Sequence, residues 1–474
     1  MQGLWRGPVD VPTSSVAAVR TPLPRTAPVP VPVSPVPPRR RGSTRRWETT
    51  CWAACAVFAL LLCLWTTITP HRVWGACAAV GYGLAGLVAH RSARVWGRSS
   101  AAVAAAGSVL VPLVFLIARG WRQMEVAVVE RAGGLLLDSG TPYVPEPGHL
   151  SDYNPYLPGM ALFGLPRAVL GDVPLADARV WFAVVSLGAM GLAAALCRGS
   201  GGAGFPDDAR RWPTPVHALL WLAATPAVAL PLAVGGVDLP VIALMCLALA
   251  LAGRGRPVAA GLALGAAASL KWTAWPLLPV GLALLAVTAG RRATVRAGAT
   301  AVALGVLAVV PVASADPGAF AEHVLLFPLG EGGTASPATS PLPGHLLATR
   351  VPGGFALAVA ALALSAVAVA VSLVTRPPRT TVAAADRLAL GLGIAMCLIP
   401  ATRFGYAVYP LVLFGWFRLA PAGRRTARPG GAVPTRPATP PETGRPLRWT
   451  SSPLRDRATA AHRNHLFTVK PLED

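Results

Sequence analysis

Long apolar segments alternate with short polar connections over most of the chain, from about residue 51 to residue 419. The segments are continuous and lack the residue-by-residue alternation of a half-buried strand. Most of them approach the roughly 20 residues that an α-helix needs to cross about 30 Å of hydrocarbon. The pattern therefore predicts an all-α, multi-pass transmembrane bundle with about 12 crossings. We place them at residues 51–69, 73–90, 101–118, 178–197, 214–234, 237–253, 257–272, 273–289, 297–315, 353–375, 388–402 and 404–419.

One apolar segment, residues 157–170, is only about 14 residues long, which is too short for an ordinary crossing. A full crossing here would also reverse the sides of all later loops. We therefore predict a re-entrant or half-depth helix with both ends on the outer side.

Arginines occur at alternate connections between the apolar segments. By the positive-inside rule these connections are cytoplasmic, which predicts that both termini are cytoplasmic and that the loops 119–156 and 316–352 are external. The arginines used for this assignment are Arg91, Arg94, Arg98, Arg198, Arg210, Arg211, Arg254, Arg256, Arg291, Arg292, Arg296, Arg376, Arg379, Arg387 and Arg418.

Composition supports an integral membrane protein and argues against a nucleic-acid partner. The chain is 54% hydrophobic and 13% charged, with a net charge of +22, whereas soluble domains average about 25% charged residues. Much of the positive charge lies in two Pro/Arg-rich ends, residues 1–46 and 421–474, which we predict to be disordered cytoplasmic tails around a transmembrane domain at residues 47–420. The seven cysteines lie in or beside apolar segments without a CxxC spacing, so we expect neither a disulfide framework nor a zinc site and name no metal ligand.

The segment 125–158 departs from this composition. It holds five of the chain's 20 acids and three of its six tyrosines. Glu125 stands at the start of an amphipathic helix near the membrane boundary, where a partly desolvated carboxylate is a competent proton acceptor. The alternative is that Glu125 complements the helix dipole. Glu130 has Arg131 beside it and is interpreted as one half of a solvated ion pair.

Residues 152–158 form a turn that leads into the short apolar segment, since Asn154-Pro155 favours a turn and Pro158 suits a first helical turn. Tyr153, Asn154 and Tyr156 are candidates for lining a sugar site. The alternative for the two tyrosines is an aromatic belt at the membrane interface.

Two further charged residues stand at the ends of apolar segments. Asp238 follows two glycines and is either a binding residue or a helix N-cap. Lys271 is one of only two lysines among 42 basic residues, which suggests a position that needs a compact ammonium group, for example to bind phosphate. The alternative is a lysine that snorkels over Trp272 and Trp275.

The outer loops supply the remaining candidates. Arg403 and Tyr406 lie in a short outer turn, where arginine runs against the charge bias and could clamp a phosphate or contact a lipid headgroup. His323 and His345 in the loop 316–352 are weaker candidates. If the outer loops fold together, these residues line a chamber that opens to the outer face.

The order of these residues resembles the GT-C class of membrane glycosyltransferases, and within it family 87, the actinobacterial type that uses polyprenyl-phosphate mannose. The resemblance covers about residues 100–420 and has two departures: Glu125 stands where the family usually has Asp, and Tyr156-Leu157 breaks a Pro-Pro pair. The matching elements are Glu125, residues 136–143 (LLDSGTPY), residues 153–158 (YNPYLP), residues 236–238 (GVD), residues 256–265 (RPVAAGLALG) and Lys271.

The resemblance implies inverting transfer of a mannose-type sugar from a polyprenyl phosphate to a glycan or glycolipid acceptor at the outer face of the cell membrane. Glu125 would be the base, and Arg403 and Lys271 with His323 would stabilise the phosphate. Tyr143, Asn154 and Tyr156 would hold sugars. We expect no nucleotide cofactor and leave a divalent metal requirement open. The alternatives are a transporter or flippase of lipid-linked sugars, or an inactive homologue.

Overall fold

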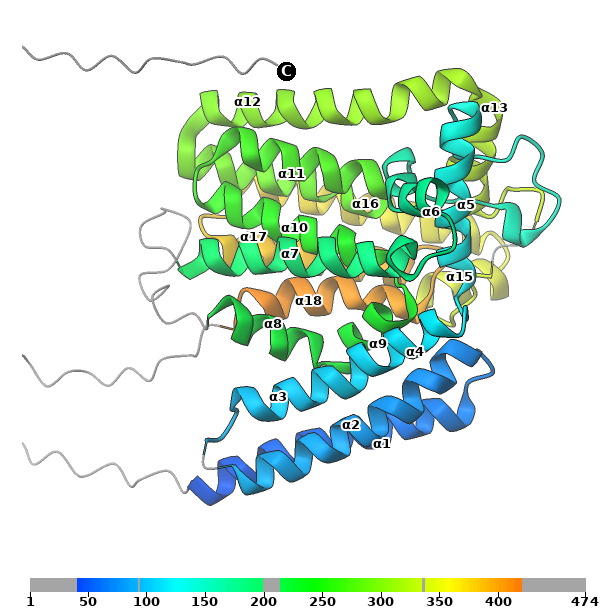
Figure 1. The fold of residues 1–474 in the computed structure, drawn as a ribbon. Coiled ribbons are helices and arrows are strands. Elements are labelled where there is room, and N and C mark those ends of the chain that lie inside the picture. Colours follow the sequence, from blue (N-terminus) through cyan, green and yellow to red (C-terminus); the bar gives the residue numbers. More distant parts are fainter. Residues whose placement is uncertain (1–40, 93, 199–213, 335–336, 420–474) are drawn as a thin grey trace, which may run out of the picture. The chain divides into compact units, whose positions relative to one another are not determined.

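The computed structural model describes residues 41–92, 94–198, 214–334 and 337–419 (Figure 1). These residues form helices and no strand; one isolated bridge joins Thr339 and Thr402. The all-α prediction is therefore confirmed for the described part of the chain. The predicted tails, 1–46 and 421–474, lie outside it, except that the first helix already begins at Arg41.

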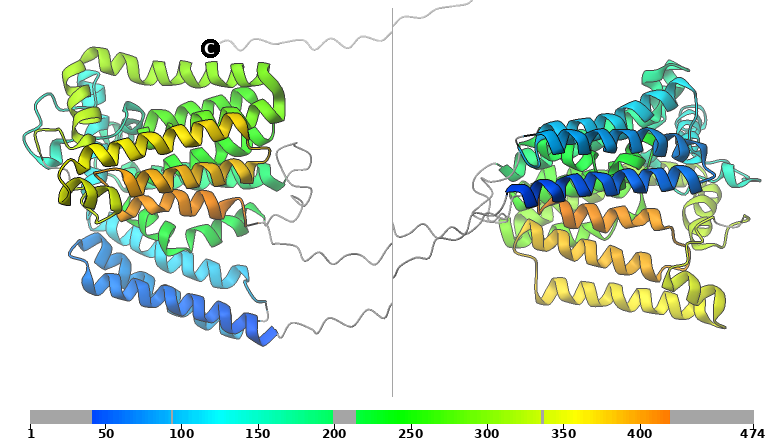
Figure 2. Two further views of the ribbon diagram at one scale, coloured as in Figure 1. Left: turned by 180° about the vertical axis from the view of Figure 1, so that it is seen from behind. Right: turned by 90° about the horizontal axis from the view of Figure 1, so that it is seen from below.

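The first three rods of the bundle form a compact group. Helices α1 (Arg41–Trp65) and α2 (Thr69–Arg91) make an antiparallel hairpin, and the hairpin packs on a rod made of α3 (Arg98–Ala105), η1 (Ala106–Leu110) and α4 (Val111–Ala118). Small residues allow close approach, because a Cβ at Gly81 would lie 2.6 Å from the Cα of Gly107. The hairpin is blue in Figures 1 and 2.

The centre of the bundle is built from α7 (Ala178–Arg198), α10 (Asp238–Gly253), α11 (Pro257–Leu270) and α12 (Leu277–Ala315), which pack on one another through Ala, Leu and Val side chains. Gly290 interrupts α12 with φ 82° and ψ 175°, a conformation that favours glycine. The two halves of α12 then lie against each other, since a Cβ at Gly298 would be 3.8 Å from Leu282 Cδ1.

The last part of the described chain adds α16 (Gly354–Thr375), α17 (Thr381–Leu398) and α18 (Val408–Trp416) beside the centre. The shorter elements lie mainly in the loops between the rods. They are α5 (Met124–Ser139), η2 (Leu150–Asp152), η3 (Pro158–Phe163), α6 (Leu165–Leu170), η4 (Pro174–Ala176), α8 (Pro215–Ala223), α9 (Pro226–Val234), η6 (Trp272–Ala274), α13 (Pro317–Phe320), η7 (Ala321–Leu326), α14 (Phe327–Leu329), α15 (Pro343–Arg350) and η8 (Phe404–Ala407).

The predicted count of about 12 crossings is not confirmed. By length and composition, seven helical segments in the described residues could cross a membrane, or eight if the bent pair α8 and α9 forms one span. Three predicted crossings correspond to apolar helices of only 10–17 residues, namely Asp238–Gly253, Pro257–Leu270 and Phe404–Trp416. The seven segments are Thr44–Trp65, Thr69–Arg91, Arg98–Ala118, Ala178–Arg198, Trp272–Ala315, Gly354–Thr375 and Thr381–Leu398.

The predicted crossing at 214–234 is not one continuous helix, because α8 and α9 meet at an angle of 82° and form either a broken span or a re-entrant loop. Pro226 begins the second helix, and the residue before a proline is disfavoured in the helical conformation. The segment 157–170 forms the short helices η3 and α6 and is not among the candidate spans, in agreement with its length.

The two ends of the bundle differ in chemistry. Arg98 donates to Thr214 at 2.8 Å, and Arg254 Nε donates to Leu196 O at 2.8 Å, so the arginine-bearing connections gather at one end, the left end in Figure 1. The opposite end carries α5, α6, α13 and α15. The loop residues singled out in the sequence lie at this second end.

Candidate functional site

Glu125 lies in the first turn of α5, and the chain around it is held at several points. Arg122 pairs with Glu130, and the buried Arg179 donates to the backbone oxygen of Trp121 at 2.8 Å. Further along α5, a Cβ at Gly133 would lie 2.3 Å from the backbone of Gly164, so α5 packs directly on the start of α6. These contacts fix both the connection into α5 and the orientation of the helix.

Glu125 forms an ion pair with Arg403, whose Nη1 lies 3.0 Å from Glu125 Oε1. The side chains are 26% and 37% exposed respectively, so both can reach solvent and ligand. The structure therefore brings the proposed base and the proposed phosphate clamp into direct contact.

Arg403 is positioned by the loop 337–345. Thr402 is fully buried and pairs with this loop, since its N–H donates to Ala338 O at 2.9 Å and its carbonyl accepts from Ser340 N at 2.9 Å. His345 Nδ1 lies 2.8 Å from Pro400 O just before this turn. Backbone pairing on one side thus directs Arg403 toward α5.

A second ion pair joins Lys271 and Asp238 at 2.6 Å, with side-chain exposures of 7% and 19%. Tyr409 donates its hydroxyl proton to Asp238 at 2.7 Å, and its oxygen lies 2.9 Å from the Thr273 hydroxyl. Asp238 makes no N-cap bond, so its carboxylate serves the ion pair instead.

Lys271 follows the end of α11 in an extended conformation. The backbone there is held by Leu157 N, which donates to Leu270 O at 3.1 Å. The Lys271 ammonium lies 4.8 Å from the ring centre of Tyr406 and 5.7 Å from that of Tyr156. Lys271 is therefore a buried, paired cation between two aromatic rings, and it does not snorkel over Trp275, which is 53% exposed.

Tyr156 connects the two ion pairs. It is buried, and its ring and that of Tyr406 both lie near the Lys271 ammonium, while Tyr406 N donates to Arg403 O at 3.1 Å. The two carboxylate–cation pairs therefore belong to one site, which contains six of the ten residues proposed from the sequence. Its members are Glu125, Arg403, Asp238, Lys271, Tyr406 and Tyr156.

The remaining four candidates, Tyr143, Tyr153, Asn154 and His323, form an adjoining cluster. His323 Nδ1 accepts the backbone N–H of Asn154 at 2.9 Å, so its Nε2 carries the proton and donates to Val144 O at 2.8 Å. Tyr143 donates to Tyr156 O at 2.8 Å. Burial lowers the pKa of His323 below its ordinary value, because desolvation disfavours the charged ring. Both ring nitrogens of His323 are thus engaged within the protein.

The outer edge of this cluster is held by Glu322. Tyr153 donates to Glu322 Oε1 at 2.8 Å, and Gly333 N donates to the same oxygen at 3.0 Å. These two hydrogen bonds stabilise the charged carboxylate and hold the pKa of Glu322 below its usual value. The bond from the Gly333 N–H has the larger effect and the bond from the Tyr153 hydroxyl the smaller one. The loop 321–334 is therefore fastened to the segment 153–156.

Glu130 differs from its prediction. It is 6% exposed, pairs with Arg122 rather than Arg131, and accepts the backbone N–H of Ala178 at 3.1 Å at the start of α7. A free N–H at a helix start attracts a carboxylate, and this explains why Glu130 is buried and structural.

Sequence reasoning did not identify Tyr409, Arg179 or His71 as parts of this region. Arg179 is fully buried and makes two bonds to Asp177, at 2.8 and 2.7 Å. The adjacent charges at the start of the apolar segment 178–197 were a usable signal. Tyr409 lies inside an apolar segment and His71 lies in the short connection between two of them, and neither gives a comparable signal.

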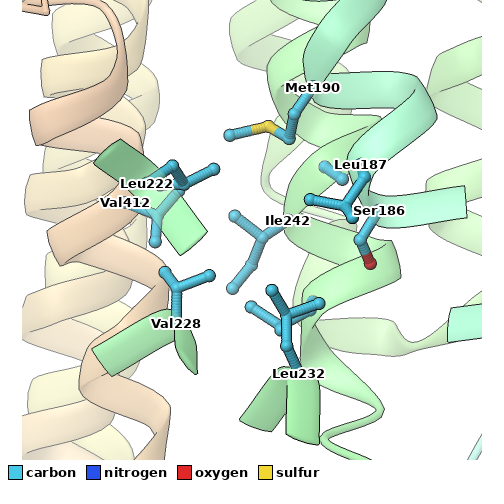
Figure 3. Close-up of a pocket in the computed structure, with 10 residues that line it drawn as sticks. Ser186, Leu187, Met190, Leu222, Val228, Leu232, Ile242 and Val412 are labelled. Carbon is cyan, nitrogen blue, oxygen red and sulfur yellow. The ribbon is translucent and has the colours of Figure 1, made fainter. Parts of the chain in front are cut away.

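In the described residues no group of three or more His, Cys, Asp and Glu side chains has a geometry that could hold a metal ion. A cavity of about 20 Å³ lies in the core between α7, α9, α10 and α18, with Met190, Val228 and Ile242 on its wall (Figure 3). It has room for about one water molecule and not for a sugar. None of the ion-paired residues lines it.

A larger groove of about 660 Å³ lies beside η3 and α6. Its walls come from η3, α6, α7, α10, α11 and α12 and are almost entirely apolar, including Leu162, Trp181 and Leu304. Leu270, the residue before Lys271, lines the same groove. The groove is thus connected to the buried ion pair through adjacent residues of the chain.

Comparison with known proteins gives one family. Residues 154–400, more than half of the chain, match glycosyltransferase family 87. No curated protein and no solved structure gave a match to the chain.

Proposed function

The chain belongs to glycosyltransferase family 87 and is a membrane glycosyltransferase, and from this premise we propose its donor, its acceptor and its side of the membrane. It moves a mannose-type sugar from a polyprenyl phosphate to a glycan or glycolipid acceptor at the outer face of the cell membrane. The observation that carries the proposal is the pairing of two carboxylates with two cations around Tyr156. Such a site offers a base and a phosphate clamp together.

The proposed reaction needs no bound nucleotide. Glu125 takes the proton of the acceptor hydroxyl while the acceptor oxygen attacks C1 of the sugar. The bond between C1 and the phosphate oxygen breaks, and the lipid phosphate leaves with the electron pair, which inverts the configuration at C1. Arg403 and Lys271 stabilise the negative charge that develops on the phosphate.

The ion pair between Glu125 and Arg403 links donor binding to base activation. A donor phosphate attracts the Arg403 guanidinium, which can bind it through two N–H groups. Glu125 Oε1 then loses its partner at 3.0 Å and becomes free to accept a proton. In this proposal the base is available only when the donor is present.

The apolar groove beside η3 and α6 supports a lipid donor. Its volume of about 660 Å³ and its apolar walls suit a hydrocarbon chain. Since Leu270 lines the groove and Lys271 follows it, a chain in the groove would bring its phosphate next to the cation.

The tyrosines supply the surfaces for the sugars. We propose that Tyr156, Tyr406 and Tyr153 face the sugar rings. Tyr143, Asn154 and His323 hold Tyr156 in place through Tyr156 O and the backbone of residue 154.

The arrangement of arginines supports the proposed orientation. Arg98 and Arg254 belong to connections at the end of the bundle opposite to the site, and cytoplasmic loops carry an excess of such residues. Both termini would therefore be cytoplasmic and the site would face outward. A transporter or flippase remains the alternative that uses the same intramembrane charges.

The test is to incubate the purified protein in lipid nanodiscs with labelled polyprenyl-phosphate mannose and a panel of glycan and glycolipid acceptors. A new glycosidic bond to an acceptor is the expected result. Movement of intact donor across a vesicle membrane without a new bond would instead identify a flippase. Binding of the donor with neither outcome would identify an inactive homologue.

A further inference from the structure

The hairpin α1–α2 precedes the segment that matches the family, yet one of its residues contacts Gln123, two positions before Glu125. His71 lies in the first turn of α2, and its Nε2 contacts the side-chain amide of Gln123. His71 also interacts electrostatically with Glu125. A helix outside the matched segment therefore touches the residues that carry the proposed base.

Gln123 is the residue from which α5 begins. It is the N-cap of α5, and its backbone oxygen accepts from Val126 N at 3.2 Å and from Ala127 N at 3.3 Å. Glu125 follows two positions later, in the first turn. A contact that fixes Gln123 therefore also fixes the backbone position from which the Glu125 side chain extends.

His71 is itself attached to a rigid part of the bundle. Trp74, on the same face of α2, is fully buried and donates its indole N–H to Ser108 O at 2.7 Å. Further along α2, the contact between Gly81 and Gly107 brings the two rods together. The position of His71 relative to the α3–α4 rod is thus set by packing.

We propose that His71 is a positioning residue for Glu125, and this inference rests on the proposed function of Glu125 as the base. Before the donor binds, Arg403 also holds the Glu125 carboxylate. When the donor phosphate binds Arg403, the ion pair to Glu125 is lost. The position of Glu125 then depends only on the start of α5. The contribution of His71 therefore appears in the chemical step and not in donor binding.

The test compares His71→Leu and His71→Gln with His90→Leu. Leu removes the polar contact to Gln123, Gln keeps a polar group near the position of the imidazole Nε2, and His90 is an exposed histidine at the other end of the same helix. We expect His71→Leu to lower kcat by about 10- to 100-fold, with the donor KM changed less than about twofold. His71→Gln should recover most of kcat, and His90→Leu should match the wild type.

An unchanged kcat in His71→Leu, or an equal loss in His90→Leu, would overturn the inference. A rise in donor KM without a fall in kcat would also overturn it, because His71 would then serve binding.

A second measurement does not depend on transferase activity. The thiol introduced by Glu125→Cys is alkylated with a water-soluble maleimide, and its peptide is quantified by mass spectrometry so that the native cysteines do not interfere. Adding His71→Leu should change the alkylation rate at least about threefold, while adding His90→Leu should not. Equal rates in all three backgrounds would refute the positioning role. A wild type inactive with every donor would refute the proposed function alone.

Discussion

The Glu125 carboxylate lies 3.0 Å from the Arg403 guanidinium, although 278 positions separate the two residues in the chain. Arg403 is brought there by the pairing of Thr402 with the loop 337–342, and Glu125 by the start of α5. The contact is partly exposed, so its value for stability is small. In the mechanism that we propose, its importance is chemical, because each partner keeps the other unavailable until the donor phosphate binds.

Glu125→Gln is expected to abolish sugar transfer while the protein still folds. The amide keeps the size of the side chain and can bond to Arg403, but it cannot accept the acceptor proton. General base catalysis contributes about 10²–10⁴-fold, so kcat should fall by at least about 100-fold. The measurement is transfer of labelled sugar by purified protein at saturating donor.

Asp138→Asn is the matched control for Glu125→Gln, because Asp138 is an exposed acid on the same helix. It should leave kcat unchanged. Full activity of the Glu125 variant would falsify the assignment of the base, and loss of activity in both variants would indicate damage to α5.

Arg403→Gln should weaken donor binding. The variant removes the group that we propose to clamp the phosphate, so the donor KM should rise by about tenfold or more. A smaller fall in kcat is expected as well, since the same cation stabilises the leaving phosphate. Steady-state kinetics with varied donor measures both constants.

Arg350→Gln tests whether any outer arginine has this effect, since Arg350 is exposed in the last turn of α15. Its donor KM should equal that of the wild type. An unchanged KM in the Arg403 variant would mean that Arg403 only pairs with Glu125 or contacts lipid headgroups.

The sequence was sufficient to predict helices, because continuous apolar runs leave few alternatives. It was not sufficient to count the crossings. Residues 214–234 have the composition of one span, but Pro226 allows the chain to bend by 82°. The bend depends on what packs around α8 and α9, and a linear pattern does not contain that information.

In the candidate site, too, the sequence predicted some features and not others. Rare charges such as Lys271 and Arg403 were visible in the sequence because the rest of the chain avoids them there. Their partners were not visible, since pairing is decided by the folding of distant loops. Glu130 was misinterpreted for this reason: its neighbour in sequence is Arg131, whereas its partners in space are Arg122 and Ala178 N.

Lys271→Met should destabilise the protein by about 3 kcal/mol, because it leaves Asp238 with a poorly solvated and unpaired charge. Adding Asp238→Asn should restore part of this loss, since the charge that needed a partner is gone. Thermal unfolding in detergent at one protein concentration measures both effects. If the second substitution restores nothing, the loss comes from packing around the lysine stem and not from the ion pair.

His323 should make stability depend on pH. Burial lowers its pKa below the ordinary value of 6.5, so the unfolded chain takes up a proton at a higher pH than the folded protein does. Stability is therefore fully present above about pH 6.5 and falls as the pH drops from there toward the folded pKa. Glu322, whose pKa is lowered from 4.5 by Gly333 N–H and Tyr153, loses its contribution only at lower pH.

The variant His323→Asn separates this effect from others. Asn can still accept the Asn154 N–H but does not titrate, so the fall in melting temperature between about pH 7.5 and pH 5.5 should become smaller. His345→Asn is the control, because His345 is a second histidine of the outer loops whose Nδ1 contacts the backbone oxygen of Pro400. An unchanged slope in the His323 variant would contradict the prediction.

Gly235→Ala should disturb the site through the backbone. Gly235 has φ 96°, and an added Cβ would lie 2.3 Å from Val126 Cγ2 and 2.7 Å from Arg179 Cγ. The variant therefore combines a strained φ with overpacking, each worth about 1–3 kcal/mol. Because Val126 follows Glu125 and Asp238 follows the same turn, the shift should also lower transfer.

Gly140→Ala isolates the conformational part of this cost. Gly140 ends α5 with φ 74°, and no atom lies within 4 Å of its added Cβ, so only the strain of a positive φ remains. The melting temperature should fall less than in Gly235→Ala, and transfer should persist. If the two variants lose equal stability, overpacking of Gly235 against α5 and α7 does not contribute to the loss. If Gly235→Ala loses stability but keeps full transfer, the two carboxylates do not depend on this turn for their alignment.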